Sequence, residues 1–132
     1  MNHVETFRFR LDNATGVPVY RQLIDQVLLA IASGVLQAGV QLPTVRQVAV
    51  DLAINPNTVV RAYRELEIRG TLTTQQGLGT FVTLTQVKED EAQRQARLSR
   101  LAADCAAKAG AEGFHLTELI ERLNELSAEA RR

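Results

Sequence analysis

Two helix-start signals lie close together in the middle of the chain and limit what the surrounding segment can form. Thr44 and Gln47 stand three residues apart, the spacing at which each side chain can satisfy the backbone amide of the other at a helix start. Asn55 is a favoured N-cap residue, and Pro56 suits the first helical position after it. The sequence therefore predicts a short helix from Thr44, a tight turn, and a second helix from Pro56.

The second of these helices has two contrasting faces. Its apolar positions recur at three- and four-residue spacing and are Val59, Ala62, Tyr63 and Leu66. The opposite face is polar and cationic and consists of Asn57, Arg61, Arg64 and Ile68, beside Thr58 at the first turn. Two helices joined by a short turn are typical of a helix-turn-helix, whose second helix lies in the DNA major groove. We therefore expect Asn57, Thr58 and Arg61 to reach the base edges.

The segments before this pair predict one more helix and one strand. From Pro18, apolar residues recur at helical spacing as far as Val35, which indicates an amphipathic helix that ends near Gly34. Residues 7–11 alternate apolar side chains with arginines, which is the period of a half-buried strand. The short helix from Thr44 turns Arg46 away from its apolar positions, which are Val45, Val48, Ala49 and Leu52.

A hairpin is predicted directly after the second helix. Residues 71–75 and 80–83 are threonine-rich runs, and Gly77 and Gly79 supply the turn between them. Taken alone, this pattern indicates no more than a tight turn. Its position after a DNA-reading helix favours a wing, in which bare glycine amides approach a phosphate or the minor groove.

Beyond residue 83 the pattern changes to two amphipathic helices with narrow apolar stripes. The stripes consist of Leu98, Leu101 and Cys105 in the first helix and of Leu116, Leu119, Ile120, Leu123 and Leu126 in the second. Two helices alone bury little surface, so we expect these side chains to pack against a second copy of the chain. The alternative is that the tail packs on the chain's own N-terminal domain. The predicted domains are residues 1–83 and residues 84–132.

Residue types that enzymes and metal sites need are scarce. The sequence contains no glycine-rich phosphate loop after a strand and no nucleophile with a credible base, and His3 and His115 lie far apart. We therefore expect no catalytic site, no metal site and no cofactor. The single cysteine, Cys105, excludes an internal disulfide and lies among alanines and leucines, so we expect it to be a small core residue.

The charge and hydropathy patterns bear on the partner and the compartment. The formal net charge is zero, which argues mildly against nucleic acid, yet all seven basic residues of 1–83 are arginine, whose planar fork suits phosphates and guanine. The longest apolar stretch, residues 27–32, is too short to cross a bilayer, and the N-terminus lacks a signal-peptide pattern. We expect a cytoplasmic protein with no membrane partner. The tail is also too small to enclose an effector pocket within one subunit.

Four stretches in order, PVYRQL, AIASGVLQAGVQLPTVRQVA, NPNTVVRAYRELEIRG and GLGTFV, resemble the GntR family of regulators and, within it, the YtrA-like subfamily with a short two-helix tail. The resemblance implies that DNA is contacted by Arg46, Asn57, Thr58, Arg61, Gly77, Gly79 and Thr80. We add the cap residues Thr44 and Asn55 and also Arg64 to this set. Three residues depart from the family pattern: Ala53 replaces a favoured glycine, and Gln75 and Gln76 replace basic wing residues.

The predicted fold is therefore mostly α with a small β-wing, a winged helix-turn-helix followed by a two-helix dimerisation tail. The predicted function is a sequence-specific transcriptional regulator, a repressor by resemblance, that binds a palindromic double-stranded DNA operator as a homodimer. Residues 56–70 would form the recognition helix in the major groove, and residues 71–83 the wing on the minor groove. Two alternatives remain: a winged-helix module that binds protein instead of DNA, and surface ion pairs of Arg61 or Arg64 with Glu65 or Glu67, or of Arg46 with an acidic residue.

Overall fold

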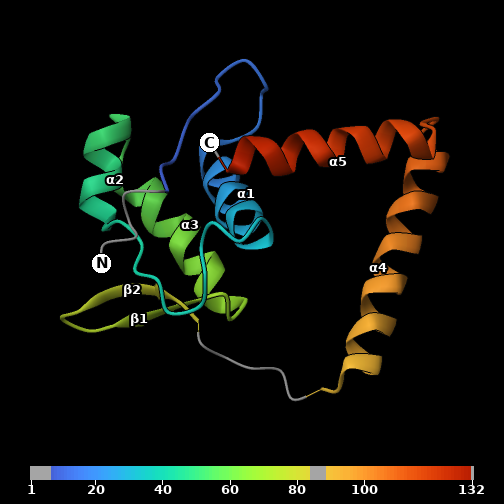
Figure 1. The fold of residues 1–132 in the computed structure, drawn as a ribbon. Coiled ribbons are helices and arrows are strands. Elements are labelled where there is room, and N and C mark those ends of the chain that lie inside the picture. Colours follow the sequence, from blue (N-terminus) through green and yellow to red (C-terminus); the bar gives the residue numbers. More distant parts are fainter. Residues whose placement is uncertain (1–6, 84–88, 132) are drawn as a thin grey trace. The chain divides into compact units, whose positions relative to one another are not determined.

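The computed structural model describes residues 7–83 and 89–131. The chain divides into two compact units, and the described residues 7–83 belong to the first and 89–130 to the second. The first unit contains α1 (Val19–Ala32), α2 (Val45–Leu52), α3 (Pro56–Ile68), β1 (Leu72–Gln75) and β2 (Gly79–Val82), as Figure 1 shows. The second contains α4 (Glu91–Ala111) and α5 (Leu116–Ala130). The fold is mostly helical with one small antiparallel sheet, as the sequence predicts.

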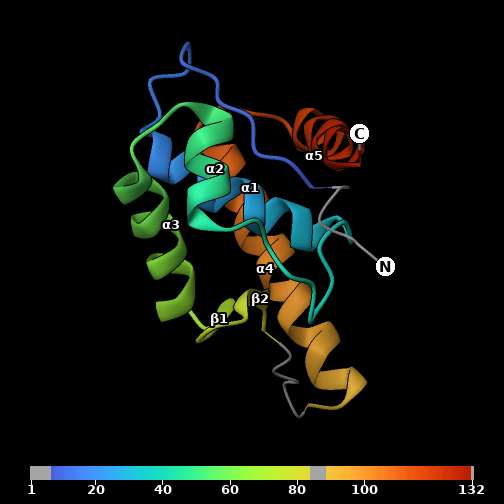
Figure 2. The same ribbon diagram turned by 90° about the vertical axis from the view of Figure 1, so that its left-hand side faces the viewer.

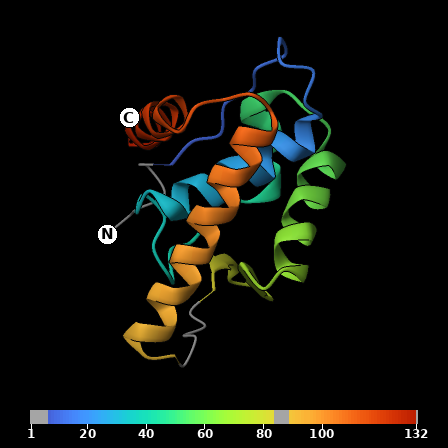
Figure 3. The same ribbon diagram turned by 90° about the vertical axis from the view of Figure 1, so that its right-hand side faces the viewer.

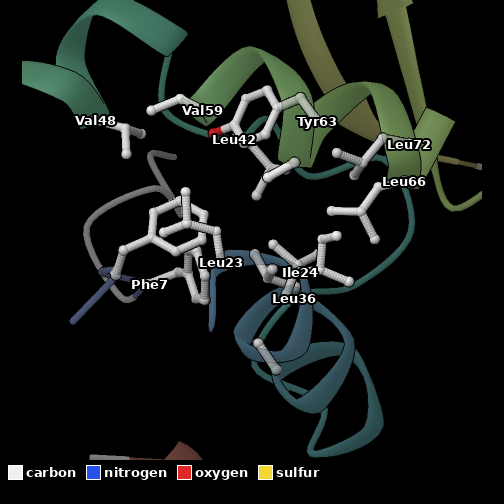
Figure 4. Close-up of a cluster of buried hydrophobic side chains, with 14 of the residues drawn as sticks. Phe7, Leu23, Ile24, Leu36, Leu42, Val48, Val59, Tyr63, Leu66 and Leu72 are labelled. Carbon is white, nitrogen blue, oxygen red and sulfur yellow. The ribbon is translucent and has the colours of Figure 1, made fainter. Parts of the chain in front are cut away.

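The core of the first unit lies between α1 and α3, and α2 closes one side of it (Figure 2). The predicted inner face of α3 is confirmed, because Val59, Ala62, Tyr63 and Leu66 are all buried. They meet the buried side of α1, which is formed by Leu23, Ile24, Val27 and Ala30 (Figure 4). Each buried aliphatic side chain of this kind contributes about 1.5 to 3 kcal/mol. This packing fixes the rotation of α3 about its own axis.

Both predicted helix starts are present. The Thr44 side-chain oxygen accepts a hydrogen bond from the backbone amide of Gln47 at 3.1 Å, and α2 begins at the next residue. The Asn55 carboxamide oxygen accepts from the amide of Asn57 at 2.8 Å, with Pro56 in the first helical position. Among the described residues, the α2 cap consists of this single bond, because the Gln47 side chain forms no hydrogen bond with the Thr44 backbone amide.

One long-range hydrogen bond joins α3 to the segment in front of α2. The buried Tyr63 hydroxyl donates to the backbone carbonyl of Pro43 at 2.6 Å. Burial raises the pKa of Tyr63, so the phenol stays protonated and remains a donor. Because Pro43 directly precedes the Thr44 cap, this bond ties the start of α2 to the middle of α3.

The predicted strand at residues 7–11 is wrong, although its burial pattern is right. Phe7 and Phe9 are buried, and Arg8 and Arg10 are exposed, but the segment belongs to no sheet. Instead of pairing with a neighbouring strand, the backbone of this segment forms hydrogen bonds with the side chain of Gln26 on α1. Its oxygen accepts from the Arg10 amide at 2.8 Å, and its nitrogen donates to the Arg10 carbonyl. The apolar alternation therefore reflects docking on helices, without β pairing.

The second unit is a pair of helices joined by a short turn (Figure 3). Asp90 and Gln93 form a reciprocal capping box at the start of α4, with bonds of 2.7 and 3.1 Å. His115 directly precedes α5, and its backbone amide donates to the Glu118 carboxylate at 2.9 Å. Both caps are local, so each helix start is fixed by residues within its own first turn.

The prediction that Cys105 is a core residue is wrong, because its thiol is exposed. Ala109 is the buried residue of α4, and α5 has no fully buried residue among those described. Two helices that meet near the turn joining them enclose little volume, so small residues around Cys105 do not make a core.

Ala53, the residue directly after α2 in the turn to α3, adopts a left-handed conformation with φ 55° and ψ 48°. It is the one non-glycine residue with positive φ among the described residues. An L-residue pays about 1 to 2 kcal/mol for this conformation, whereas glycine adopts it freely. The sequence resemblance placed a favoured glycine at this position.

We therefore expect Ala53→Gly to raise the free energy of unfolding by about 1 kcal/mol, after the larger entropy of glycine in the unfolded chain is subtracted. Chemical denaturation measures the change. Ala53→Val is the matched control and should lower stability, because a β-branched residue is strained further at positive φ. Equal stability of all three proteins would contradict a strained Ala53.

Candidate nucleic-acid interface

Four of the predicted DNA-contacting side chains lie on α3. Asn57, Arg61 and Arg64 are exposed, and Thr58 is half-buried at the first turn. A shallow depression runs along this face and is lined by Asn57, Val60, Arg61, Arg64, Glu65 and Ile68. The structure therefore brings Asn57, Arg61 and Arg64 together on one surface, opposite the buried face, and Thr58 lies outside the lining of this depression.

The start of α2 lies near the middle of α3, because the Tyr63 hydroxyl bonds to the Pro43 carbonyl just before Thr44. Thr44, Arg46 and Asn55 are all exposed. Between the helices lies a second shallow depression that is mainly apolar, and Arg46 forms part of its lining along with Val45, Ala49, Val50, Ile54 and Pro56. Val50 on its rim is 72% exposed.

Among the described residues, the arginines of this surface form no salt bridges with carboxylates. The salt bridges among the described residues join Arg97 to Glu89 and Arg122 to Glu125, and none falls within residues 7–83. The alternative in which Arg61 or Arg64 pairs with Glu65 or Glu67 is therefore not realised there. These guanidinium groups keep their hydrogen-bond donors for another partner.

Arg61 makes one contact that the sequence pattern did not predict. Its guanidinium carbon lies 3.6 Å from the centroid of the Tyr20 ring, which is a cation–π stack. Tyr20 is the second residue of α1 and is half-buried against the core. Nothing in the sequence pairs residues so far apart in the chain, because the contact depends on how α1 crosses α3.

The predicted wing is the antiparallel pair β1 and β2, with Leu72 opposite Val82 and Gln75 opposite Gly79. Gly77 has a φ of +82° and lies in the exposed turn, and Leu78 beside it is 66% exposed. The Thr80 hydroxyl is half-buried and lies 3.3 Å from that of Thr74 across the strands. The glycines and Thr80 thus fall on one short hairpin that follows α3 directly.

Gln41, in the connection between α1 and α2, holds the tip of this wing and was not identified from the sequence. Its side-chain nitrogen donates to the Leu78 carbonyl at 3.0 Å, and its backbone forms an isolated β-bridge with Phe81. A Cβ at Gly79 would lie only 2.5 Å from the same Gln41 nitrogen. A side chain at Gly79 would displace the end of the Gln41 side chain from the Leu78 carbonyl, and the φ of +128° is one that L-residues rarely adopt.

The wing carries no formal charge. Residues 71–83 contain no Lys, Arg, Asp or Glu, so the hairpin offers backbone amides, hydroxyls and carboxamides. The exposed cations of the α2 and α3 surface are Arg46, Arg61, Arg64 and Arg69. The positive charge of this candidate surface therefore comes from α2, α3 and Arg69.

The apolar stripe of the second unit is largely exposed. Five of its members are 49% to 66% exposed, namely Leu98, Leu101, Leu116, Ile120 and Leu123. Leu119 and Leu126 are half-buried. Isolated exposed leucines are ordinary, but this many along two helices form a surface that favours a partner.

Within the parts of the chain that the structure describes, no cluster of His, Cys, Asp or Glu has the size of a metal site. None of the helices in those parts is long and apolar enough to cross a membrane.

Comparison with known proteins gives consistent matches. The family profile described as bacterial regulatory proteins, gntR family, matches residues 19–82. The transcriptional repressor YtrA of Bacillus subtilis is 34% identical over 92% of this chain and 94% of its own length. Two solved structures are similar in fold. A protein named as a transcriptional antiterminator from Listeria monocytogenes has a TM-score of 0.68 and 25% identity, over 96% of this chain and 95% of its own. YtrA from Sulfolobus acidocaldarius has a TM-score of 0.54 and 29% identity, over 72% and 97%.

The contact between Gln41 and the wing predicts the effect of adding one methyl group. Gly79→Ala should lower the free energy of unfolding by about 1 to 3 kcal/mol, because the new Cβ meets the Gln41 side chain at a strained φ. Gly77→Ala is the control without a close approach, since its φ is +82° and an added Cβ there meets no atom within 4 Å. Denaturant unfolding of both variants measures the difference. A Gly79→Ala variant no less stable than Gly77→Ala would contradict the close approach.

Proposed function

The chain belongs to the gntR family of bacterial regulatory proteins, and we propose that it represses transcription by binding a palindromic DNA operator as a homodimer. The observation that carries this proposal is the two-faced α3. Its inner face is buried, and its outer face presents Asn57, Arg61 and Arg64 without an ion-pair partner among the described residues. Because operator DNA is in the cytoplasm of a bacterium, the protein would act there.

In the proposed complex, the first turns of α3 enter the major groove. Arg61 is suited to donate two hydrogen bonds to the O6 and N7 atoms of a guanine, and Asn57 to pair with an adenine edge. Thr58 is placed at the first turn, where it can reach a base or a phosphate. Thr44, Arg46 and Asn55 would contact phosphates beside the groove, and Arg64 a phosphate further along α3.

The wing would lie on the minor groove next to the α3 site. Gly77 and Gly79 bring backbone amides to the surface without side chains that would collide with the sugar-phosphate walls, and Thr80 adds a hydroxyl. Because residues 71–83 are uncharged, wing contacts would add little to the salt dependence of binding. The four arginines of α2 and α3 would account for most of that dependence.

The tail would supply the second copy. Its largely exposed apolar stripe would be covered by the same stripe of a partner chain and consists of Leu98, Leu101, Cys105, Leu116, Leu119, Ile120, Leu123 and Leu126. A two-fold dimer places two recognition helices on half-sites one helical turn apart, about 34 to 36 Å, which requires a palindromic operator.

A protein-binding role for the winged helix is the second candidate, and the exposed apolar residues Val50 and Ile68 favour it. The regulator would bind DNA of a defined sequence with a salt-dependent affinity, whereas the protein-binding module would not prefer any DNA sequence. Gel-shift titration across a salt series, with the duplex upstream of the protein's own gene and a random duplex as competitor, separates them. Selective binding supports the regulator, and equal weak binding to both duplexes supports the protein-binding module.

We expect Arg61→Ala to weaken operator binding by about 1 to 3 kcal/mol and to relax the preference at one base pair. Arg69→Ala is the matched control, because Arg69 is an exposed arginine just after α3 and would contact a phosphate at most. Its expected effect is a uniform loss across sequences and a salt slope reduced by about one unit. An Arg61→Ala protein with unchanged operator affinity and base preference would refute the recognition-helix assignment.

The tail proposal predicts that charge in the stripe separates the two copies. Leu101→Glu combined with Leu123→Glu should give a monomer in sedimentation velocity, since each carboxylate replaces a leucine whose burial is worth about 2 kcal/mol or more. Leu78→Glu, at an exposed leucine of the wing, is the control and should remain dimeric. A wild-type protein that sediments as a monomer at micromolar concentration would contradict the homodimer.

A further inference from the structure

We propose that Tyr20 is a positioning residue for Arg61, so that base selection by α3 depends on a ring supplied by α1. The inference rests on the proposed function, because it concerns how the recognition helix presents one of its side chains. It identifies a residue away from the α3 face as a determinant of sequence specificity.

The Tyr20 ring is a flat surface held by the core, and the otherwise mobile Arg61 side chain lies against it. Tyr20 is half-buried and packs against the core, so α1 holds its ring in one place. The Arg61 guanidinium lies over the face of that ring, 3.6 Å from its centroid, while the residue itself remains exposed. The α1–α3 packing around Leu23, Val59 and Leu66 is fully buried and fixes the distance between the two residues' helices.

Stacking restrains Arg61 without occupying its donors. An exposed arginine samples many rotamers, and part of this rotamer entropy is lost when the side chain is fixed on DNA. A ring that holds the guanidinium beforehand lowers that loss. The N–H groups of a guanidinium lie in its own plane, and a ring stacked on its face leaves them available to guanine O6 and N7. The contact therefore orders Arg61 in a form that can still bind.

Two competing roles for the stack would affect DNA binding differently. If the stack only stabilises the packing of α1 on α3, removing the ring lowers stability, but its effect on DNA binding does not depend on Arg61. If the stack holds Arg61 away from the DNA, removing the ring tightens binding. Positioning requires weaker binding, loss of base preference, and dependence of both on Arg61.

The test is a double-mutant cycle of Tyr20→Leu and Arg61→Ala in the full chain, on the duplex that the wild-type protein selects. Tyr20→Leu should weaken operator binding about three- to tenfold and relax preference at the base pair affected by Arg61→Ala. In the Arg61→Ala background, Tyr20→Leu should have no further effect. Tyr20→Phe keeps the aromatic face and should bind within about twofold of wild type.

Independent effects of the two substitutions would overturn the proposal, as would unchanged or tighter binding by Tyr20→Leu. If the Tyr20→Leu chain does not fold, a measurement on the free wild-type protein tests the Arg61–Tyr20 stack instead. The Arg61 side-chain protons should show an upfield ring-current shift in NMR spectra, and its absence would overturn the proposal. Failure of the proposed regulator function would give a different result, because the wild-type protein itself would then bind no duplex in preference to another.

Discussion

The packing of α3 on α1 is the constraint on which the rest of the first unit depends. Leu23 and Val27 of α1 and Val59 and Leu66 of α3 are completely or almost completely removed from solvent. Because α3 is a regular helix, burying one face fixes the direction of every other side chain on it. The outward position of Arg61 therefore follows from apolar residues that would never contact DNA. The same packing brings the Tyr20 ring beneath that arginine.

The position of α2 depends on a local strain and a long-range bond. The left-handed Ala53 turns the chain sharply between the two helices, at a cost that the surrounding packing must offset. The Tyr63 hydroxyl ties Pro43 to the middle of α3 and so fixes the other end of α2. A winged helix-turn-helix needs this rigidity, because an arginine or a cap displaced by an ångström no longer matches base edges and phosphates together.

A protein with a formal net charge of zero can still bind DNA when its fold gathers arginines on one surface. The α2 and α3 surface concentrates arginines without ion-pair partners among the described residues, whereas the wing is uncharged and is held by Gln41. Such a protein attracts DNA weakly at long range and depends on short-range contacts for affinity. Its specificity would then rest on the precise presentation of a few side chains, which is the role proposed for Tyr20.

Local sequence patterns suffice to predict the helix starts at Thr44 and Asn55, the two faces of α3 and the glycine turn of the wing, because each depends on residues within a few positions of one another. Most of the candidate DNA surface could be predicted for the same reason. Long-range packing, in contrast, is what docks residues 7–11 on Gln26 instead of in a strand, makes Gln41 hold the wing, and stacks Arg61 on Tyr20. The tertiary structure also places Cys105 at the surface. These features join residues distant in the chain or depend on how much surface neighbouring helices cover, and no local pattern encodes either.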